Sequence, residues 1–206
     1  MGEQLAQNVN NMWQLCVRGR LEEVIMALEA GGDPESTGGQ DRTTCLMEAV
    51  RRGRKPMVAK LLSVPGINVN AKDLLGATAL HYACLNFSTL LNYEVGILNM
   101  LLSCPGLLYN EKRNPHPAGL YDDKQGTGGE TPVMLAARYG SSELLRIMVS
   151  NAKVDLNVVD NDGLTLEASF HGFRDGNLRG IGKARILQIV EEARKRRRCE
   201  HRFIFG

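Results

Sequence analysis

The chain has 206 residues, enough for one ordinary domain or for a stack of short repeated units. Apolar residues make up 43% of it but aromatic residues only 5%, so aliphatic side chains must fill the core. The net charge is +2, and residues 173–206 carry ten Lys and Arg against four Asp and Glu, which concentrates positive charge at the carboxyl end. No run approaches the roughly 18 apolar residues of a membrane-spanning helix, and the amino terminus lacks a secretory signal pattern. We therefore expect a cytoplasmic protein that does not enter a membrane.

Residues 8–36 have the pattern of a first helix pair. Met12, Leu15 and Cys16 share one helical face, and Gly19 marks the turn before a second apolar pattern. The surrounding residues are polar, which suits the water-facing end of a repeat array, so we predict an amino-terminal cap. Trp13 lies beside the apolar face and suits either core packing or ligand contact.

Residues 37–70 predict a second unit. Thr44 is a good N-cap before the apolar positions of a first helix, and Leu61 belongs to the face of a second helix. Four cations surround Gly53, and this cluster suits either a solvated turn or an acidic partner. They are Arg51, Arg52, Arg54 and Lys55.

Residues 71–109 predict a third unit, whose first helix follows a turn. The run is Asp73-Leu-Leu-Gly76-Ala-Thr78-Ala-Leu80-His81-Tyr-Ala83. Ala49 and Leu61 are 12 residues apart (61 − 49), whereas the equivalent Ala83 and Leu101 are 18 apart (101 − 83). Six extra residues therefore lengthen the turn between the helices, around 86–93.

A larger insertion follows at residues 110–125. Thr44 and Thr78 are 34 residues apart (78 − 44), but Thr78 and Thr131 are 53 apart (131 − 78). After the six extra residues are removed, about 13 remain. They fall in a segment with proline and glycine and no apolar period, which predicts a loop. It is either a mobile spacer or a finger that contacts a partner.

Residues 126–159 predict a fourth unit, in which Thr131 is an N-cap followed by Pro132 at the first helical position. Residues 160–198 begin in the same way but then lose the pattern, because Glu167 occupies a leucine position. A last helix over 181–198 keeps an apolar face. We predict that it is a carboxy-terminal cap, followed by a tail at 199–206.

The repeated phrases Gly76-Ala-Thr78-Ala-Leu80-His81-Tyr-Ala83 and Gly129-Glu-Thr131-Pro132-Val-Met-Leu-Ala136-Ala137 resemble the T-P-L-H-x-A core of the ankyrin repeat family. The resemblance covers about residues 10 to 170. It implies one all-α domain over 1–206, a solenoid of about five helix-turn-helix units with degenerate ends. It also implies a concave face, made of turn fingers and first helices, that binds another protein. Asn70 and Asn157 match positions that can be hydroxylated in related repeats.

The sequence offers no catalytic or metal-binding pattern. It lacks a nucleophile elbow, a phosphate-binding loop and a zinc-protease motif, and its four histidines are scattered. The five cysteines form no pair with metal-ligand spacing, which suits small buried thiols in a reducing compartment. We expect no enzyme activity, no cofactor and no metal.

The register of the repeats predicts which residues face a partner. These positions precede each Gly-x-Thr or follow each first helix, and they are Asp41, Arg51, Arg52, Leu74, Leu75, Leu85, Asn86, Glu130, Arg138, Tyr139, Asp162 and Leu164. Leu74 and Leu75 are unusual because a free turn tip should be polar, so they are either an apolar anchor or packing for the next finger. We expect a monomer that acts as an adaptor, scaffold or inhibitor.

A basic run ends the last predicted helix. It consists of Arg194, Lys195, Arg196, Arg197 and Arg198. Such a run is a solvated helix end, a nuclear import signal, or a patch for nucleic acid or acidic lipid. The alternative function is therefore a nuclear or nucleic-acid-associated regulator that uses this run.

Overall fold

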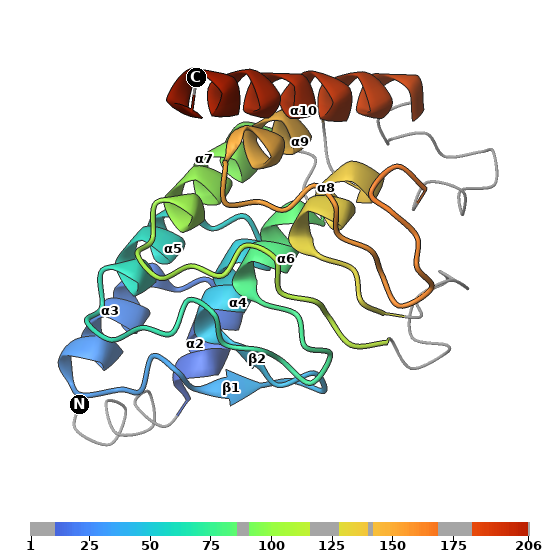
Figure 1. Ribbon diagram of the computed structural model, residues 1–206. Helices are drawn as coiled ribbons and strands as arrows, with labels where there is room; N and C mark the ends of the chain where they lie inside the picture. Colours follow the sequence, from blue (N-terminus) through green and yellow to red (C-terminus); the bar gives the residue numbers. More distant parts are fainter. Residues whose placement is uncertain (1–10, 86–90, 116–127, 140–141, 169–182, 206) are drawn as a thin grey trace. The chain divides into compact units, whose positions relative to one another are not determined.

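A computed structural model describes residues 11–85, 91–115, 128–139, 142–168 and 183–205 (Figure 1). The fold is all-α: within these residues the only sheet is a hairpin with two residues in each strand. None of the helices in the described ranges is both long enough and apolar enough to cross a membrane. The chain divides into two compact units. The first comprises Met1–Ala83 with Phe87–Leu107, and the second comprises Cys84–Asn86 with Leu108–Gly206.

The first unit consists of helix pairs in two rows (Figure 1). In one row α2 (Met12–Arg18) packs against α4 (Cys45–Arg51), and α6 (Ala79–Cys84) is the corresponding first helix of the third repeat. In the other row α5 (Lys55–Leu62) lies between α3 (Leu21–Glu29) and α7 (Leu91–Leu102). Each repeat thus covers the apolar face of the next, because a single helix pair cannot bury its own.

The predicted helix faces form the core. In the first unit Leu15, Cys16, Leu61 and Leu101 are fully or almost fully buried, as their spacing predicted. The buried residues of α3 are Val24 and Ala27.

Residues at the helix starts satisfy backbone groups that the helix itself leaves unpaired. The Thr44 hydroxyl accepts a hydrogen bond from the Met47 N–H at 3.2 Å, as the N-cap prediction requires. In the third repeat His81 takes the position of Met47, and its Nδ1 accepts a hydrogen bond from the Thr78 N–H at 3.1 Å. His81 is therefore a structural residue inside the repeat.

Trp13 supports the hairpin of strands β1 (Thr37–Gly38) and β2 (Thr43–Thr44). Its indole N–H donates to the Thr43 hydroxyl at 3.2 Å, and its ring covers Gly38 so closely that a Cβ there would lie 2.3 Å from a ring atom. Only glycine fits at this position. The half-buried Trp13 is thus part of the packing of the first unit.

Polar side chains join consecutive repeats at their outer ends. The Asn70 side chain donates to the Gly106 carbonyl at 2.8 Å in the first unit. In the second unit the Asn110 side chain donates to the Lys153 carbonyl at 3.0 Å and accepts from the Asp155 N–H at 2.8 Å. These bonds satisfy backbone groups that lie outside any helix or strand.

In the second unit α9 (Ser142–Ser150) packs against both α8 (Pro132–Tyr139) and α10 (Lys183–Phe205). The apolar face of α10 is buried as predicted, and its residues are Ile186, Ile189, Val190 and Ala193. The helix continues past Arg198 to Phe205, so residues expected to form a tail are helical. The sequence explains this extension, because neither glycine nor proline occurs between Arg198 and Gly206.

Some predicted features lie outside the described residues, namely Asn86, residues 116–125 of the insertion and the glycine-containing stretch that precedes α10. The two ends of the insertion are described, and they pair with each other. The Arg113 N–H donates to the Glu130 carbonyl at 3.1 Å, and the Gly129 N–H donates to the Arg113 carbonyl at 2.7 Å. The chain therefore enters and leaves the insertion at adjacent positions, which these two hydrogen bonds hold together.

Arg42 is strained by its backbone conformation. It has a φ of +53°, the only positive value at a non-glycine residue in the described ranges. It occupies the turn position that Gly76, Gly129 and Gly163 fill in other repeats, all with positive φ. A side chain in this left-handed region costs about 1–2 kcal/mol.

Replacing Arg42 with glycine should therefore stabilise the protein by about 0.5 kcal/mol, since the relief of strain exceeds the extra freedom that glycine gives the unfolded chain. Urea unfolding followed by circular dichroism measures the change. Gly76→Ala is the matched control and should lower stability by about 1 kcal/mol. A lower stability for Arg42→Gly would show that the arginine side chain stabilises the turn.

Candidate functional site

The third repeat presents Leu74 on a turn that is fixed by hydrogen bonds. The Asp73 carboxylate accepts from the N–H groups of Leu75 at 2.8 Å and Ala77 at 2.9 Å. The Leu74 N–H donates to the Asp41 carbonyl at 2.8 Å, which ties this turn to the preceding one. The Leu74 side chain is 57% exposed, whereas Leu75 is half-buried. The two leucines therefore differ, and Leu74 is the one that reaches solvent.

The second unit contains the same turn. The Asp160 carboxylate accepts from the N–H groups of Asp162 at 3.0 Å and Leu164 at 2.8 Å. The Asn161 N–H donates to the Gly128 carbonyl at 3.1 Å, as Leu74 does to Asp41. Leu164 is 38% exposed at this turn. Both units thus hold an apolar side chain outward on a rigid backbone.

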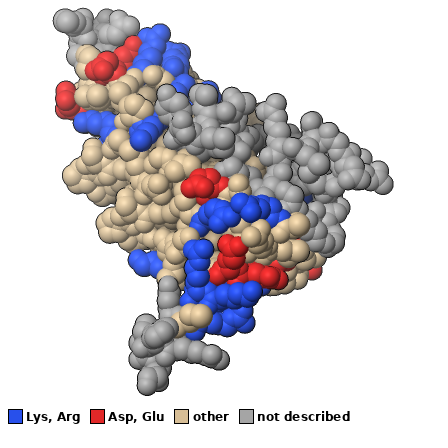
Figure 2. All heavy atoms as spheres, turned by 90° about the horizontal axis from the view of Figure 1, so that it is seen from above, with Lys and Arg blue, Asp and Glu red and all other residues tan. Residues whose placement is uncertain are grey.

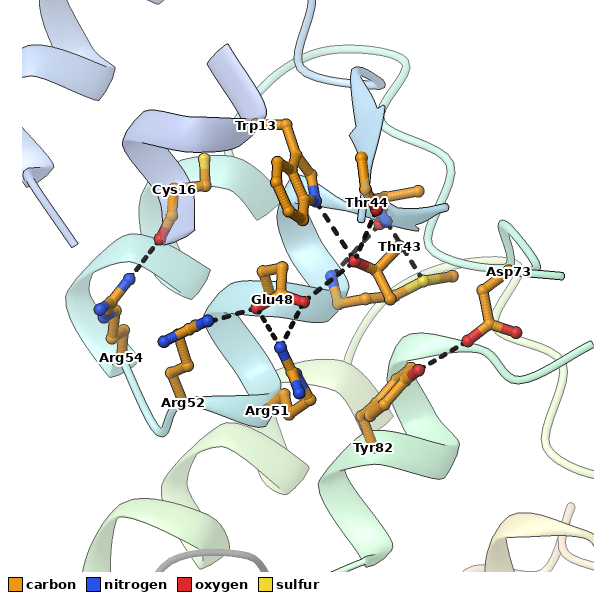
Figure 3. Close-up of polar contacts among 12 residues, drawn as sticks. Trp13, Cys16, Thr43, Thr44, Glu48, Arg51, Arg52, Arg54, Asp73 and Tyr82 are labelled. Atoms are coloured by element: carbon orange, nitrogen blue, oxygen red, sulfur yellow. Dashed lines mark hydrogen bonds and ion pairs between the residues drawn. The ribbon is translucent and has the colours of Figure 1, made fainter. Parts of the chain in front are cut away.

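A buried carboxylate organises the cations of the second repeat (Figure 3). Glu48 is 1% exposed, and both its oxygens accept from Arg51, at 2.7 and 2.8 Å. Arg52 donates through Nε at 2.9 Å, and the Thr43 hydroxyl donates at 3.0 Å. The side chains of Arg51 and Arg52 remain 37% exposed. Sequence reasoning did not identify Glu48, although a charge among apolar residues was a signal.

The two arginines keep Glu48 ionised. Burial acts to raise the pKa of this carboxyl, but the hydrogen bonds from Arg51 and Arg52 outweigh it, and the pKa lies below its usual value. The ion pair is therefore present at neutral pH.

Tyr82 and Asp73 form a second polar contact in the first unit (Figure 3). The Tyr82 hydroxyl donates to the Asp73 carboxylate at 2.6 Å. Burial, followed by this bond and the charge of Asp73, raises the pKa of Tyr82 above its usual value, so the phenol stays protonated. The charge of Asp41 also raises the pKa of Tyr82, and the charge of Arg51 lowers it. Tyr82 was not among the predicted contact residues.

Two residues predicted to contact a partner are enclosed in the second unit. Glu130 is 3% exposed and accepts from Arg113 at 3.0 and 3.1 Å and from Arg138 at 3.0 Å. The Arg138 side chain is 8% exposed and lies over the Tyr139 ring, 5.3 Å from its centroid. Glu130 and Arg138 are therefore enclosed where the insertion joins the repeat, and they offer little surface to a partner.

The basic side chains of α10 fall on two sides of the helix, one packed against the rest of the second unit and the other exposed to solvent. Arg197 donates to the carbonyls of Val154 at 2.7 Å, Val149 at 2.9 Å and Asn151 at 2.7 Å. Arg194 donates to the Leu156 carbonyl at 2.8 Å and pairs with Glu167. The other three cations of the run are exposed; they are Lys195, Arg196 and Arg198. Figure 2 shows basic side chains on the face that carries α10, with acidic ones between them.

The remaining predicted residues occupy varied positions. Asp41, Leu85 and Tyr139 are half-buried, Asp162 is exposed, and Asn86 lies outside the described residues. Within the described part of the chain, no group of three His, Cys, Asp or Glu side chains is placed to hold a metal ion.

Comparison with known families agrees with the observed repeats. A family model of three ankyrin repeats matches residues 12–113, and a second ankyrin repeat model matches residues 122–166. None of the curated proteins compared with the chain matches it.

Replacing Glu48 with glutamine should lower the free energy of unfolding by about 1–2 kcal/mol at pH 7, because two half-exposed arginines lose their counter-charge. The pKa of Glu48 is depressed in the folded protein, so this contribution is complete above the unfolded value of about 4.3 and is lost as the pH falls through the folded pKa. Urea unfolding of both proteins from pH 7 to pH 3 should show the difference shrinking. A difference independent of pH would exclude an ion-pair origin.

Replacing Arg197 with methionine should lower the melting temperature by several degrees, because three partly buried carbonyls lose their donor. Arg196→Met is the matched control. Its side chain is 68% exposed, and we expect a change of less than about 0.5 kcal/mol. Equal melting temperatures for the two variants would contradict a structural role for Arg197.

Proposed function

Because the chain belongs to the ankyrin repeat family, we propose that it is a non-catalytic module that binds another protein as an adaptor, scaffold or inhibitor. Ankyrin repeats are generally protein–protein interaction modules, and the family is typically non-catalytic. We assign the partner contact to the turn fingers and the first helices. We further propose that the protein is a monomer in the cytoplasm.

The observation that carries the proposal is the exposure of Leu74 on a fixed turn. The Leu74 side chain is 57% exposed, and covering it with a partner favours binding because its apolar surface leaves water. Since backbone hydrogen bonds already hold its turn, binding costs little conformational entropy there. A rigid apolar tip near arginine and tyrosine side chains has the composition of an interface hot spot.

We assign a separate contact surface to each unit. The first-unit surface consists of Asp41, Arg51, Arg52, Leu74, Leu75 and Tyr82. The second-unit surface consists of Leu85, Tyr139, Asp162 and Leu164. Asn86 remains a sequence-based member of the second set.

A second candidate function uses the outer side of α10. Lys195, Arg196 and Arg198 are exposed on one helix, which suits contact with nucleic acid or an import factor in the nucleus. Nucleic-acid binding would weaken steeply between 50 and 200 mM salt. If the affinity for a duplex DNA probe stays the same over this range, nucleic-acid binding by this helix is excluded.

The central proposal is tested with Leu74→Ser and Leu75→Ser as baits beside the unchanged chain. Leu74→Ser should reduce capture of the partner from lysate at least tenfold while the free energy of unfolding changes by less than about 0.5 kcal/mol. Leu75→Ser, at a half-buried position, should be less stable than Leu74→Ser. Quantitative mass spectrometry and thermal melting measure the two effects.

Leu108→Ser is the control, because Leu108 is 49% exposed and belongs to neither surface. If Leu108→Ser loses the same captured proteins as Leu74→Ser, the capture reflects nonspecific binding to exposed apolar side chains. Unchanged capture by Leu74→Ser would reject Leu74 as the anchor.

A further inference from the structure

Resting on that proposed function, we propose that the first-unit surface recognises an acidic protein segment in which an Asp or Glu side chain lies near a large apolar side chain. The carboxylate would bind Arg52, and the apolar side chain would cover Leu74. Charge, geometry and exposure in the first unit each support this chemistry.

The first element is an excess of positive charge. Residues 40–55 contain five cations, at positions 42, 51, 52, 54 and 55, against the carboxylates of Asp41 and Glu48. Glu48 is buried beneath Arg51 and Arg52, so it orients their guanidinium groups without presenting its own charge to solvent. A basic segment would meet repulsion here, whereas an acidic one would be attracted.

The second element is the geometry of Arg52. Its bond to Glu48 engages Nε, at 2.9 Å, and its side chain is 37% exposed. The edge of a guanidinium that carries the two Nη atoms can bind a carboxylate through two parallel hydrogen bonds. Because Glu48 already fixes the plane of the group, an incoming carboxylate meets an oriented fork.

The third element is the crowding of like charges beside Arg52. Arg54 is held by a hydrogen bond to the Cys16 carbonyl (Figure 3). Burial, and after it the charge of Arg52, lowers the pKa of Arg54. Two guanidinium groups that repel each other are both stabilised by an anion placed against them.

The fourth element is the apolar contact. The Tyr82 hydroxyl binds Asp73, the residue before Leu74, and Figure 3 draws Tyr82 on the same side as Arg51, whose charge also acts on the pKa of Tyr82. The Asp73 carboxylate is engaged by Tyr82 and by the backbone of its own turn. Beside the cations, this side therefore offers a phenol ring and the exposed Leu74, which fit an apolar side chain.

The probe is a phage-displayed library of random 12-residue peptides selected on the full chain. We expect enriched peptides to contain Asp or Glu together with Leu or Phe. The best peptide and a copy with Asn and Gln in place of Asp and Glu are then synthesised. Fluorescence polarisation should show at least tenfold weaker binding of the neutral copy, and a loss of affinity between 50 and 200 mM salt.

Variants assign the carboxylate to Arg52. Arg52→Gln should weaken the acidic peptide at least tenfold but leave the affinity of the neutral copy nearly unchanged. Arg52→Lys retains the charge opposite Glu48 and loses the fork, so it should bind the acidic peptide with intermediate affinity. Arg20→Gln is the matched control, because Arg20 is a surface arginine paired with Glu23 on α3, and it should change nothing.

The outcomes separate the two proposals. Enriched peptides that require Leu74 but are neutral or basic, or that ignore Arg52→Gln, overturn the acidic partner and leave the first-unit surface as a binding site. Peptides whose binding survives both Leu74→Ser and Arg52→Gln, or a selection without enrichment, overturn the acidic partner and this surface together. An affinity of Arg52→Lys between those of the unchanged chain and Arg52→Gln supports the fork. A loss for Arg20→Gln as large as that for Arg52→Gln rejects it.

Discussion

Each unit depends on a backbone hydrogen bond that joins one finger turn to the next. It runs from the Leu74 N–H to the Asp41 carbonyl in the first unit, and from the Asn161 N–H to the Gly128 carbonyl in the second. Turn backbone lacks helix or strand partners, and a buried donor without an acceptor costs about 1–3 kcal/mol. Because backbone atoms make this connection, side chains at the turn tips are not needed for it. Leu74 and Leu164 can therefore remain exposed on a rigid support.

Buried carboxylates determine how the arginines of the first helices are used. Glu48 and Glu130 each accept hydrogen bonds from two arginines, which offset the several kcal/mol that burial of an ion costs. The result differs between repeats. Arg51 still presents part of its guanidinium to solvent, whereas Arg138 is enclosed. Equivalent positions in a repeat thus hold a partly exposed arginine in one unit and an enclosed arginine in the other.

The terminal helix shows the same division within five residues. Arg194 and Arg197 donate to carbonyls at and beyond the end of α9, while Lys195, Arg196 and Arg198 face water. Two residues of this basic run therefore hold the last helix against the rest of the second unit. A partner that binds this run as an extended peptide would first have to break the hydrogen bonds of Arg194 and Arg197 to these carbonyls.

The repeat period, the N-cap Thr44 and the buried helix faces could be predicted, because they follow from local patterns such as Thr44 before α4 and the spacing of Leu15 and Cys16. The other predicted N-cap, Thr131, differs, because its buried hydroxyl has no hydrogen-bond partner among the described residues. The roles of Glu48, Tyr82 and Glu130 could not. Their partners include residues up to 17 positions away, and Arg197 reaches carbonyls 43 to 48 positions away. The sequence by itself determined the repeat, the turn that carries Leu74 and the concentration of basic residues at the end. Only the tertiary structure decided which charges are exposed, because a helical period sets the direction of a side chain but not whether a carboxylate, a carbonyl or water lies there.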